Sequence, residues 1–220
     1  MNRATGRLDS FTDAAFAFAL SLLVIGNSQI PTNIDELQSA MANVPVFAIG
    51  FAIIGMFWYG HVRWREYRGD GGGLSVVLTF ALVFFVMIYI PPLQAMSASF
   101  AAYLGGSGTR FAGDIGGMFL IYGVGFTALS AVLALLFWEA ERAMRRAGNA
   151  RWRIARGEMG IWLILGVTGL FSILLASIAA TKNFAPFVHA TLPVSIGLFV
   201  WRYRWVEPVP ETEMEAGPEA

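Results

Sequence analysis

The chain has 220 residues, of which 56% are hydrophobic and only 14% charged, with 15 basic and 15 acidic side chains. Soluble domains carry about 25% charged residues, so this composition excludes an ordinary soluble domain and is typical of a membrane protein. The sequence has no cysteine, which excludes a disulfide framework and thiol catalysis, and its two histidines do not supply a zinc site unaided.

Six apolar windows each approach the roughly 20 residues that a helix needs to cross the hydrocarbon core. Backbone polar groups in lipid must be satisfied within a helix or a closed barrel, and continuous apolar runs favour helices. The sequence therefore predicts an all-α, polytopic membrane protein with six transmembrane helices forming one domain over residues 1–205. In chain order, the windows are 10–28, 44–62, 74–97, 112–138, 158–180 and 184–205.

The basic residues are distributed unequally between the two sides of such a six-helix arrangement. Only Arg110 and Lys182 fall on one side, and the other basic residues fall on the opposite side. The positive-inside rule then predicts that the N- and C-termini are both cytoplasmic. Residues 206–220 carry five glutamates and three prolines with little to bury, so we expect a disordered acidic tail there.

The start of the chain allows one alternative. Arg7 followed by the apolar run 14–25 also fits the pattern of a cleavable signal peptide. Asp9 and Asp13 interrupt the basic leader, and cleavage would leave an odd number of spans. A retained first helix is therefore the preferred interpretation.

Motifs that support an enzyme are absent from the sequence. It contains no Walker loop, H-E-x-x-H, G-x-S-x-G or dinucleotide-binding fingerprint, and its charged residues gather at helix ends. We therefore expect a non-enzymatic protein without cofactor or bound metal. Its expected partners are the lipid bilayer and not nucleic acid.

Ionisable groups at the entrance of the first apolar helix are the most informative local feature, because such groups need partners near a membrane. Ser10 and Asp13 fit a helix-capping role, which is one interpretation. Arg7 and Asp13 are six residues apart, so they point about 120° away from each other on an ideal helix. Asp13 is therefore expected to contact another helix, and His61, near Trp58, is a candidate partner. A histidine satisfied at the membrane interface is the alternative.

The run Arg7, Phe11, Thr12 and Asp13 resembles the Arg-x-x-x-Phe-Ser-Asp signature of the transmembrane protein 175 family of potassium channels. The second apolar window adds a similar aromatic-then-histidine ending, with Trp58 and His61. The resemblance implies a prokaryotic, potassium-selective cation channel in the cell membrane. It also implies a homotetramer in which the first helix of each subunit lines the pore.

The resemblance further implies where the pore narrows. Phe18, Leu22 and Ile25 occupy the positions of the family's hydrophobic gate, and Ser21 occupies the position of a hydroxyl-bearing ring. Phe18 is larger than the residue that the family places there. Periodicity does not select this stripe by itself, because every face of the helix is apolar and the stripe of Phe16, Leu20 and Leu23 is equally regular.

Two other functions remain open from the residues alone. A proton or small-solute transporter requires an ionisable residue near the middle of the membrane, and only His189 fits that description. A nonconducting membrane scaffold of the same fold is the other possibility, because fold does not determine function and Phe18 is large enough to plug a pore.

Overall fold

The computed structural model describes residues 3–25, 30–42, 44–69, 71–104 and 115–203 of the chain. Within these ranges all regular secondary structure is helical, in agreement with the predicted all-α class. The acidic tail predicted for residues 206–220 and the basic residue Arg110 lie outside the described residues. The long helices are α1 (Arg3–Ile25), α3 (Val44–Arg68), α4 (Gly73–Leu104), α5 (Ile115–Arg146) and α6 (Trp152–Ser177).

Shorter helices complete the described part of the chain. Between α1 and α3 lies α2 (Ile34–Ala42), and after α6 the chain forms a broken helical segment. Pro193 cannot donate a backbone hydrogen bond, so the turn before it is a 3-10 turn and not a continuous α-helix. The segment consists of η1 (Lys182–Phe184), α7 (Ala185–Val188), η2 (His189–Thr191) and α8 (Leu192–Tyr203).

Length and apolar composition support several membrane spans. Among the described residues, four helical segments are long and apolar enough to cross a membrane, or up to five if the bent pair of α2 and α3 counts as one. α1 is not among them, and it carries Arg7, Asp9 and Asp13 in its first half. The predicted number of six spans therefore stays a prediction.

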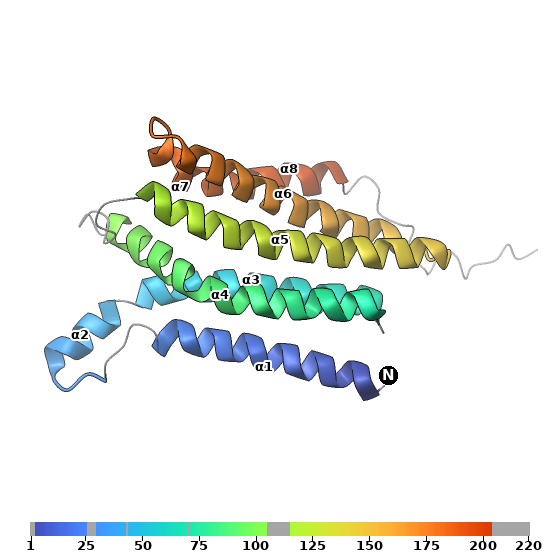
Figure 1. Cartoon of the computed structure of the whole chain (residues 1–220), viewed down its shortest axis with the longest axis horizontal. Coiled ribbons are helices and arrows are strands. Elements are labelled where there is room, and N and C mark those ends of the chain that lie inside the picture. Colours follow the sequence, from blue (N-terminus) through green and yellow to red (C-terminus); the bar gives the residue numbers. More distant parts are fainter. Residues whose placement is uncertain (1–2, 26–29, 43, 70, 105–114, 204–220) are drawn as a thin grey trace, which may run out of the picture.

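The helices lie roughly parallel or antiparallel in one bundle, with α1 along one edge and α6 with α8 along the other (Figure 1). The centre of the bundle is aromatic. Phe57 of α3 packs against Phe126 of α5 and Trp162 of α6, each with ring centroids 5.6 Å apart, and against Tyr89 of α4 at 6.4 Å. One buried ring thus joins four helices.

α4 bends in its second half, where it turns toward α5 (Figure 1). Pro91 and Pro92 lie inside this helix, and each removes a backbone donor that would otherwise bond to the preceding turn. The bend follows from these two residues. Just beyond it, the Gln94 amide donates to the carbonyl oxygens of Leu22 at 3.2 Å and Leu23 at 3.1 Å, so α4 supports the end of α1.

The arginine-rich ends of the helices lie together. The start of α1, the end of α3, the end of α5 and the start of α6 are at the same end of the bundle (Figure 1). Their arginines include Arg65, Arg145 and Arg153, whereas Lys182 lies at the opposite end of α6. The described chain therefore has one strongly basic end, as the predicted topology requires.

Candidate functional site

Packing gives α1 two different faces. Its buried face consists of Thr12, Phe16, Ala19 and Leu23, which are all less than 10% exposed and recur at helical spacing. This face packs on α3 and α4. The opposite face is open within the described chain, and 57% of Phe18 is exposed there.

The predicted pore residues lie on or beside this open face. Phe18 and Ser21 are exposed, whereas Leu22 is partly buried against the core. The Ser21 hydroxyl donates to the carbonyl oxygen of Ala17 at 3.0 Å. Ile25 is the last residue of α1, and its side chain lies outside the described residues.

The alternative stripe on α1 has a different environment. Phe16 is 2% exposed and Leu23 is 6% exposed, so both belong to the core, and Leu20 packs partly against it. Folding thus separates two stripes that the sequence left equivalent. The stripe with Phe16 faces the chain's own helices, whereas Phe18 is exposed and Leu22 is only partly buried.

The signature residues of α1 have four different environments. Arg7 is exposed and has no hydrogen bond or ion pair to another described residue. The Phe11 ring lies 5.5 Å from the Phe80 ring of α4. Thr12 is fully buried, and its hydroxyl donates to the Leu8 carbonyl at 2.9 Å. The Asp13 carboxylate accepts a hydrogen bond of 2.9 Å from the Trp58 indole of α3.

The partner of Asp13 is therefore Trp58 and not the candidate His61. His61 is 2% exposed, and its Nε2 lies 3.3 Å from the hydroxyl oxygen of Thr79 in α4. The reason is the direction of each side chain from α3. Trp58 is 40% exposed beside α1, whereas His61 is buried between α3 and α4.

A second contact between α1 and α3 lies nearer the basic end. Arg65 binds Asp9 through two atom pairs, Nε to Oδ1 at 2.7 Å and a terminal nitrogen to Oδ2 at 2.9 Å. The sequence analysis did not pair these residues. A signal was present, because Asp9 and Asp13 are four residues apart and so share one face of α1.

Arginines near the end of α3 connect it to three other helices. Arg65 reaches α1, Arg63 bonds to Glu158 of α6 at 2.6 Å, and Arg68 bonds to both oxygens of Glu139 of α5 at 2.9 Å. The side chains of these ion pairs are between 13% and 32% exposed. Three partly buried ion pairs therefore fix α3 within the bundle at its basic end.

His189, the one residue that a transporter could use, is packed among aromatic rings. His189 lies against Tyr122 and Phe126 of α5, with ring centroids 5.4 Å and 5.3 Å away. No carboxylate contacts it among the described residues, and no group of three or more His, Asp or Glu in those residues is arranged to hold a metal ion. This packing fits a histidine within an aromatic cluster.

Comparisons with known proteins give consistent matches. The family model described as endosomal/lysosomal potassium channel TMEM175 matches residues 7–91, from the signature of α1 to Pro91 of α4. A curated potassium channel from Marivirga tractuosa is 29% identical over 145 residues, covering 61% of this chain. The matched region spans only 58% of the length of that relative.

Solved structures match over most of the chain. A variant of the potassium channel MtTMEM175, crystallised with a nanobody–MBP fusion protein, aligns with a TM-score of 0.78 and 24% identity. That match covers 91% of this chain and 94% of the other. A homologue of the lysosomal potassium-selective channel TMEM175, from Chamaesiphon minutus, gives a TM-score of 0.58 at 20% identity, covering 92% and 99% of the two chains.

Proposed function

We propose that the chain is a member of the TMEM175 family of potassium channels and that it forms a potassium-selective cation channel in the cell membrane of a prokaryote. The proposed channel is a homotetramer with six spans in each subunit and both termini in the cytoplasm. α1 of each subunit lines the central pore.

The observation that carries this proposal is the open face of α1. A helix in the interior of a single bundle buries most of its circumference, yet α1 lies at the edge and leaves Phe18 57% exposed. Small residues flank Phe18 on this face, namely Ala14, Ala17 and Ser21. Small side chains let helices approach closely in lipid, which suits the meeting of four copies around an axis.

Phe18, Leu22 and Ile25 then form the hydrophobic gate. Their spacing of four and three residues places them in successive layers along the same side of α1. Rings of apolar side chains close a pore by expelling water, because the narrow apolar space no longer holds a hydrated ion. Opening requires these rings to move apart by a tilt or rotation of α1.

Ser21 supplies the polar ring between the gate layers. Its hydroxyl hydrogen is engaged by the Ala17 carbonyl, so the lone pairs of the oxygen are directed away from the helix. Four such oxygens replace part of the hydration shell of a potassium ion as it passes. This is the role that we assign to Ser21.

The contacts between α1 and α3 hold the pore face in its orientation. Asp13 is bound by Trp58 and Asp9 by Arg65, both on the side of α1 that faces α3. A rotation of α1 would break both contacts. We therefore assign Phe11, Thr12 and Asp13 of the signature, with Trp58 and His61, to the network that positions the pore helix, whereas Arg7 has no partner among the described residues of one subunit.

Potassium flux from proteoliposomes tests the proposal. Purified protein is reconstituted with a potassium gradient and a proton ionophore, and flux is compared with sodium and with empty liposomes. We expect potassium flux above sodium flux, an increase for Phe18→Ala and altered selectivity for Ser21→Ala. Phe171→Ala is the matched control, because Phe171 is 51% exposed on α6, at the opposite edge of the bundle. Absence of flux in both the wild type and Phe18→Ala would refute the channel.

A further inference from the structure

Exposed arginines gather where α5 ends and α6 begins, at the basic end of the bundle (Figure 1). The Trp152 ring joins the two helices there, because the Arg145 guanidinium lies 5.0 Å and the Arg153 guanidinium 5.6 Å from its centroid. Five exposed arginines of this region take part in no ion pair among the described residues. We call them the arginine corner, and they are Arg142, Arg146, Arg151, Arg153 and Arg156.

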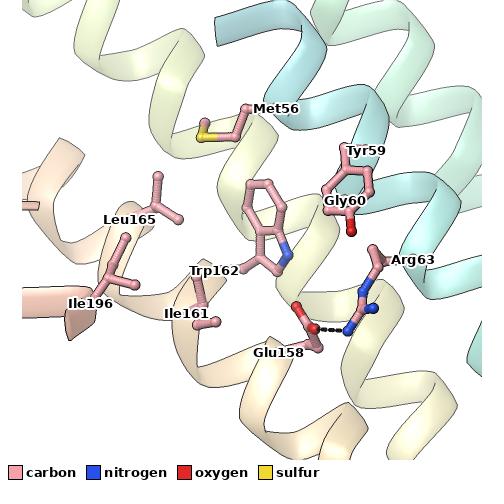
Figure 2. Close-up of a pocket in the computed structure, with 9 residues that line it drawn as sticks. All are labelled: Met56, Tyr59, Gly60, Arg63, Glu158, Ile161, Trp162, Leu165 and Ile196. Atoms are coloured by element: carbon pink, nitrogen blue, oxygen red, sulfur yellow. Dashed lines mark hydrogen bonds and ion pairs between the residues drawn. The ribbon is translucent and has the colours of Figure 1, made fainter. Parts of the chain in front are cut away.

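Carboxylates near the arginine corner do not neutralise it, because each already has another partner. Glu141 lies 3.4 Å from Arg145, one turn further along α5. Glu139 and Glu158 bond to arginines of α3, and Figure 2 shows the second of these ion pairs, from Glu158 to Arg63 at 2.6 Å. The corner therefore keeps an unbalanced positive charge at the surface, and a surface of one sign attracts a partner of the opposite sign.

The end of α8 is fixed beside the arginine corner. The Tyr203 hydroxyl donates to the Arg153 carbonyl oxygen at 2.7 Å. The Tyr203 ring also packs on Gly157 of α6, where an added Cβ would lie 2.8 Å from the ring, so glycine allows α8 to approach this closely. Phe199 stacks on Tyr203, with ring centroids 5.4 Å apart, and packs in the same way on Gly160. The chain that follows Tyr203 therefore starts next to the arginines of α6.

The following segment, outside the described residues, is acidic. Residues 205–220 contain no lysine, arginine or histidine. They contain five glutamates, as many as there are arginines in the corner, namely Glu207, Glu211, Glu213, Glu215 and Glu219. Four extended residues span at most about 14 Å, which is the reach of Glu207 from Tyr203. Arg151 lies only about 9 Å along α6 from the Tyr203 contact at Gly157, so the glutamates reach the corner.

We propose that the glutamates of residues 207–219 dock on the arginine corner of the same subunit. Charge complementarity and the starting point of the segment both select this occupant. An exposed ion pair is weak by itself and shifts an equilibrium by about 1.4-fold to fivefold. Several pairs act together here, and the covalent connection raises the local concentration of the segment to roughly millimolar. The contact does not involve α1 or depend on ion conduction, so it is tested separately from the channel.

Disulfide cross-linking of the full-length protein tests the contact, because the sequence contains no cysteine of its own. Ala150→Cys places a thiol on the exposed turn beside Arg151, and Met214→Cys places one between Glu213 and Glu215. In detergent at low salt, mild oxidation should join the two thiols within one subunit. The matched control carries the same cysteines with the five glutamates replaced by glutamine, and it should cross-link at least about fivefold more slowly. Salt at about 1 M, which shortens the Debye length to about 3 Å, should slow the first protein to a similar rate.

Two further measurements identify the surface and its occupant. Arg146→Gln combined with Arg153→Gln should slow cross-linking at least about twofold, because two of the attracting charges are removed. Lys182→Gln removes a charge at the opposite end of α6 and should leave the rate unchanged. In nanodiscs, the rate in phosphatidylglycerol should stay within about twofold of the rate in phosphatidylcholine, because the tethered segment and not the lipid occupies the corner.

Three results would overturn the proposal. Equal rates for the glutamate and glutamine segments, or no effect of the arginine substitutions, would show proximity without docking. A product that joins only different subunits would make the segment a ligand of a neighbouring copy. A reaction that is retained in phosphatidylcholine and lost in phosphatidylglycerol would assign the arginine corner to anionic lipid head groups.

Discussion

The ion pair between Asp9 and Arg65 should stabilise the fold measurably, because it joins α1 to α3 near the basic end of the bundle. The two side chains are 32% and 15% exposed, so water weakens the pair less than it weakens a surface pair. A hydrogen bond between charged groups contributes about 1.5–3 kcal/mol in net terms, and this pair has one, beside the 2.7 Å ion contact between Nε and Oδ1. Partial exposure lowers the expected coupling to about 2 kcal/mol.

The two single substitutions should differ in their effects. Arg65→Gln leaves the Asp9 carboxylate without its counter-charge and also removes the bond from Arg65 to the Gly69 carbonyl, so we expect a loss of about 2–3 kcal/mol. Asp9→Asn keeps the shape of the side chain and leaves Arg65 bonded to Gly69, so we expect about 1–2 kcal/mol. The smaller loss corresponds to a decrease in melting temperature of about 2–8 °C for a chain of this size.

A double-mutant cycle isolates the coupling. Thermal unfolding of the detergent-solubilised wild type, the two single variants and the double variant is followed by circular dichroism. The double variant should be less destabilised than the sum of the singles by about 2 kcal/mol. The pair of Arg145 and Glu141 is a useful comparison, because Arg145 is 57% exposed and their coupling should stay below about 0.5 kcal/mol. Equal coupling in the two cycles would refute the assigned importance of the α1–α3 contact.

Two further substitutions test the packing. Gln94→Leu should lower the free energy of unfolding by about 1–2 kcal/mol, because the carbonyl oxygens of Leu22 and Leu23 lose their donor. A variant that unfolds at the same temperature as the wild type would contradict this role of Gln94. Gly60→Ala should destabilise by about 1–3 kcal/mol, because an added Cβ would lie 2.2 Å from the Trp162 ring. Gly197→Ala is its control, since nothing lies within 4 Å of the added atom, and equal effects of the two would disprove the close contact.

If α1 lines a pore, substitutions on its two faces should affect ion flux and stability differently. Phe18 makes few contacts within its own chain, so Phe18→Ala should change flux with little effect on the unfolding of a subunit, whereas Phe16→Ala should destabilise by about 3–5 kcal/mol. A flux increase accompanied by a large stability loss in Phe18→Ala would place Phe18 in the core instead.

Composition and pattern were sufficient for the general architecture. A chain that is 56% hydrophobic with six long apolar windows cannot remain in water, so helical membrane segments follow from hydropathy and backbone hydrogen bonding alone. The arginines could be assigned to one end because alternate connections between spans lie on the same side of the membrane. The signature from Arg7 to Asp13 was sufficient to indicate the family, because its spacing is a property of the sequence and not of the packing.

Only the tertiary structure distinguished between the faces of α1. Every side of this helix is apolar, so its sequence contains no amphipathic signal, and the stripes of Phe16 and Phe18 differ in how far α3 and α4 cover them. The partners of Asp13 and Asp9 were also decided by packing. Trp58 and Arg65 lie more than 40 residues away along the chain, and they meet these carboxylates because α3 returns antiparallel beside α1.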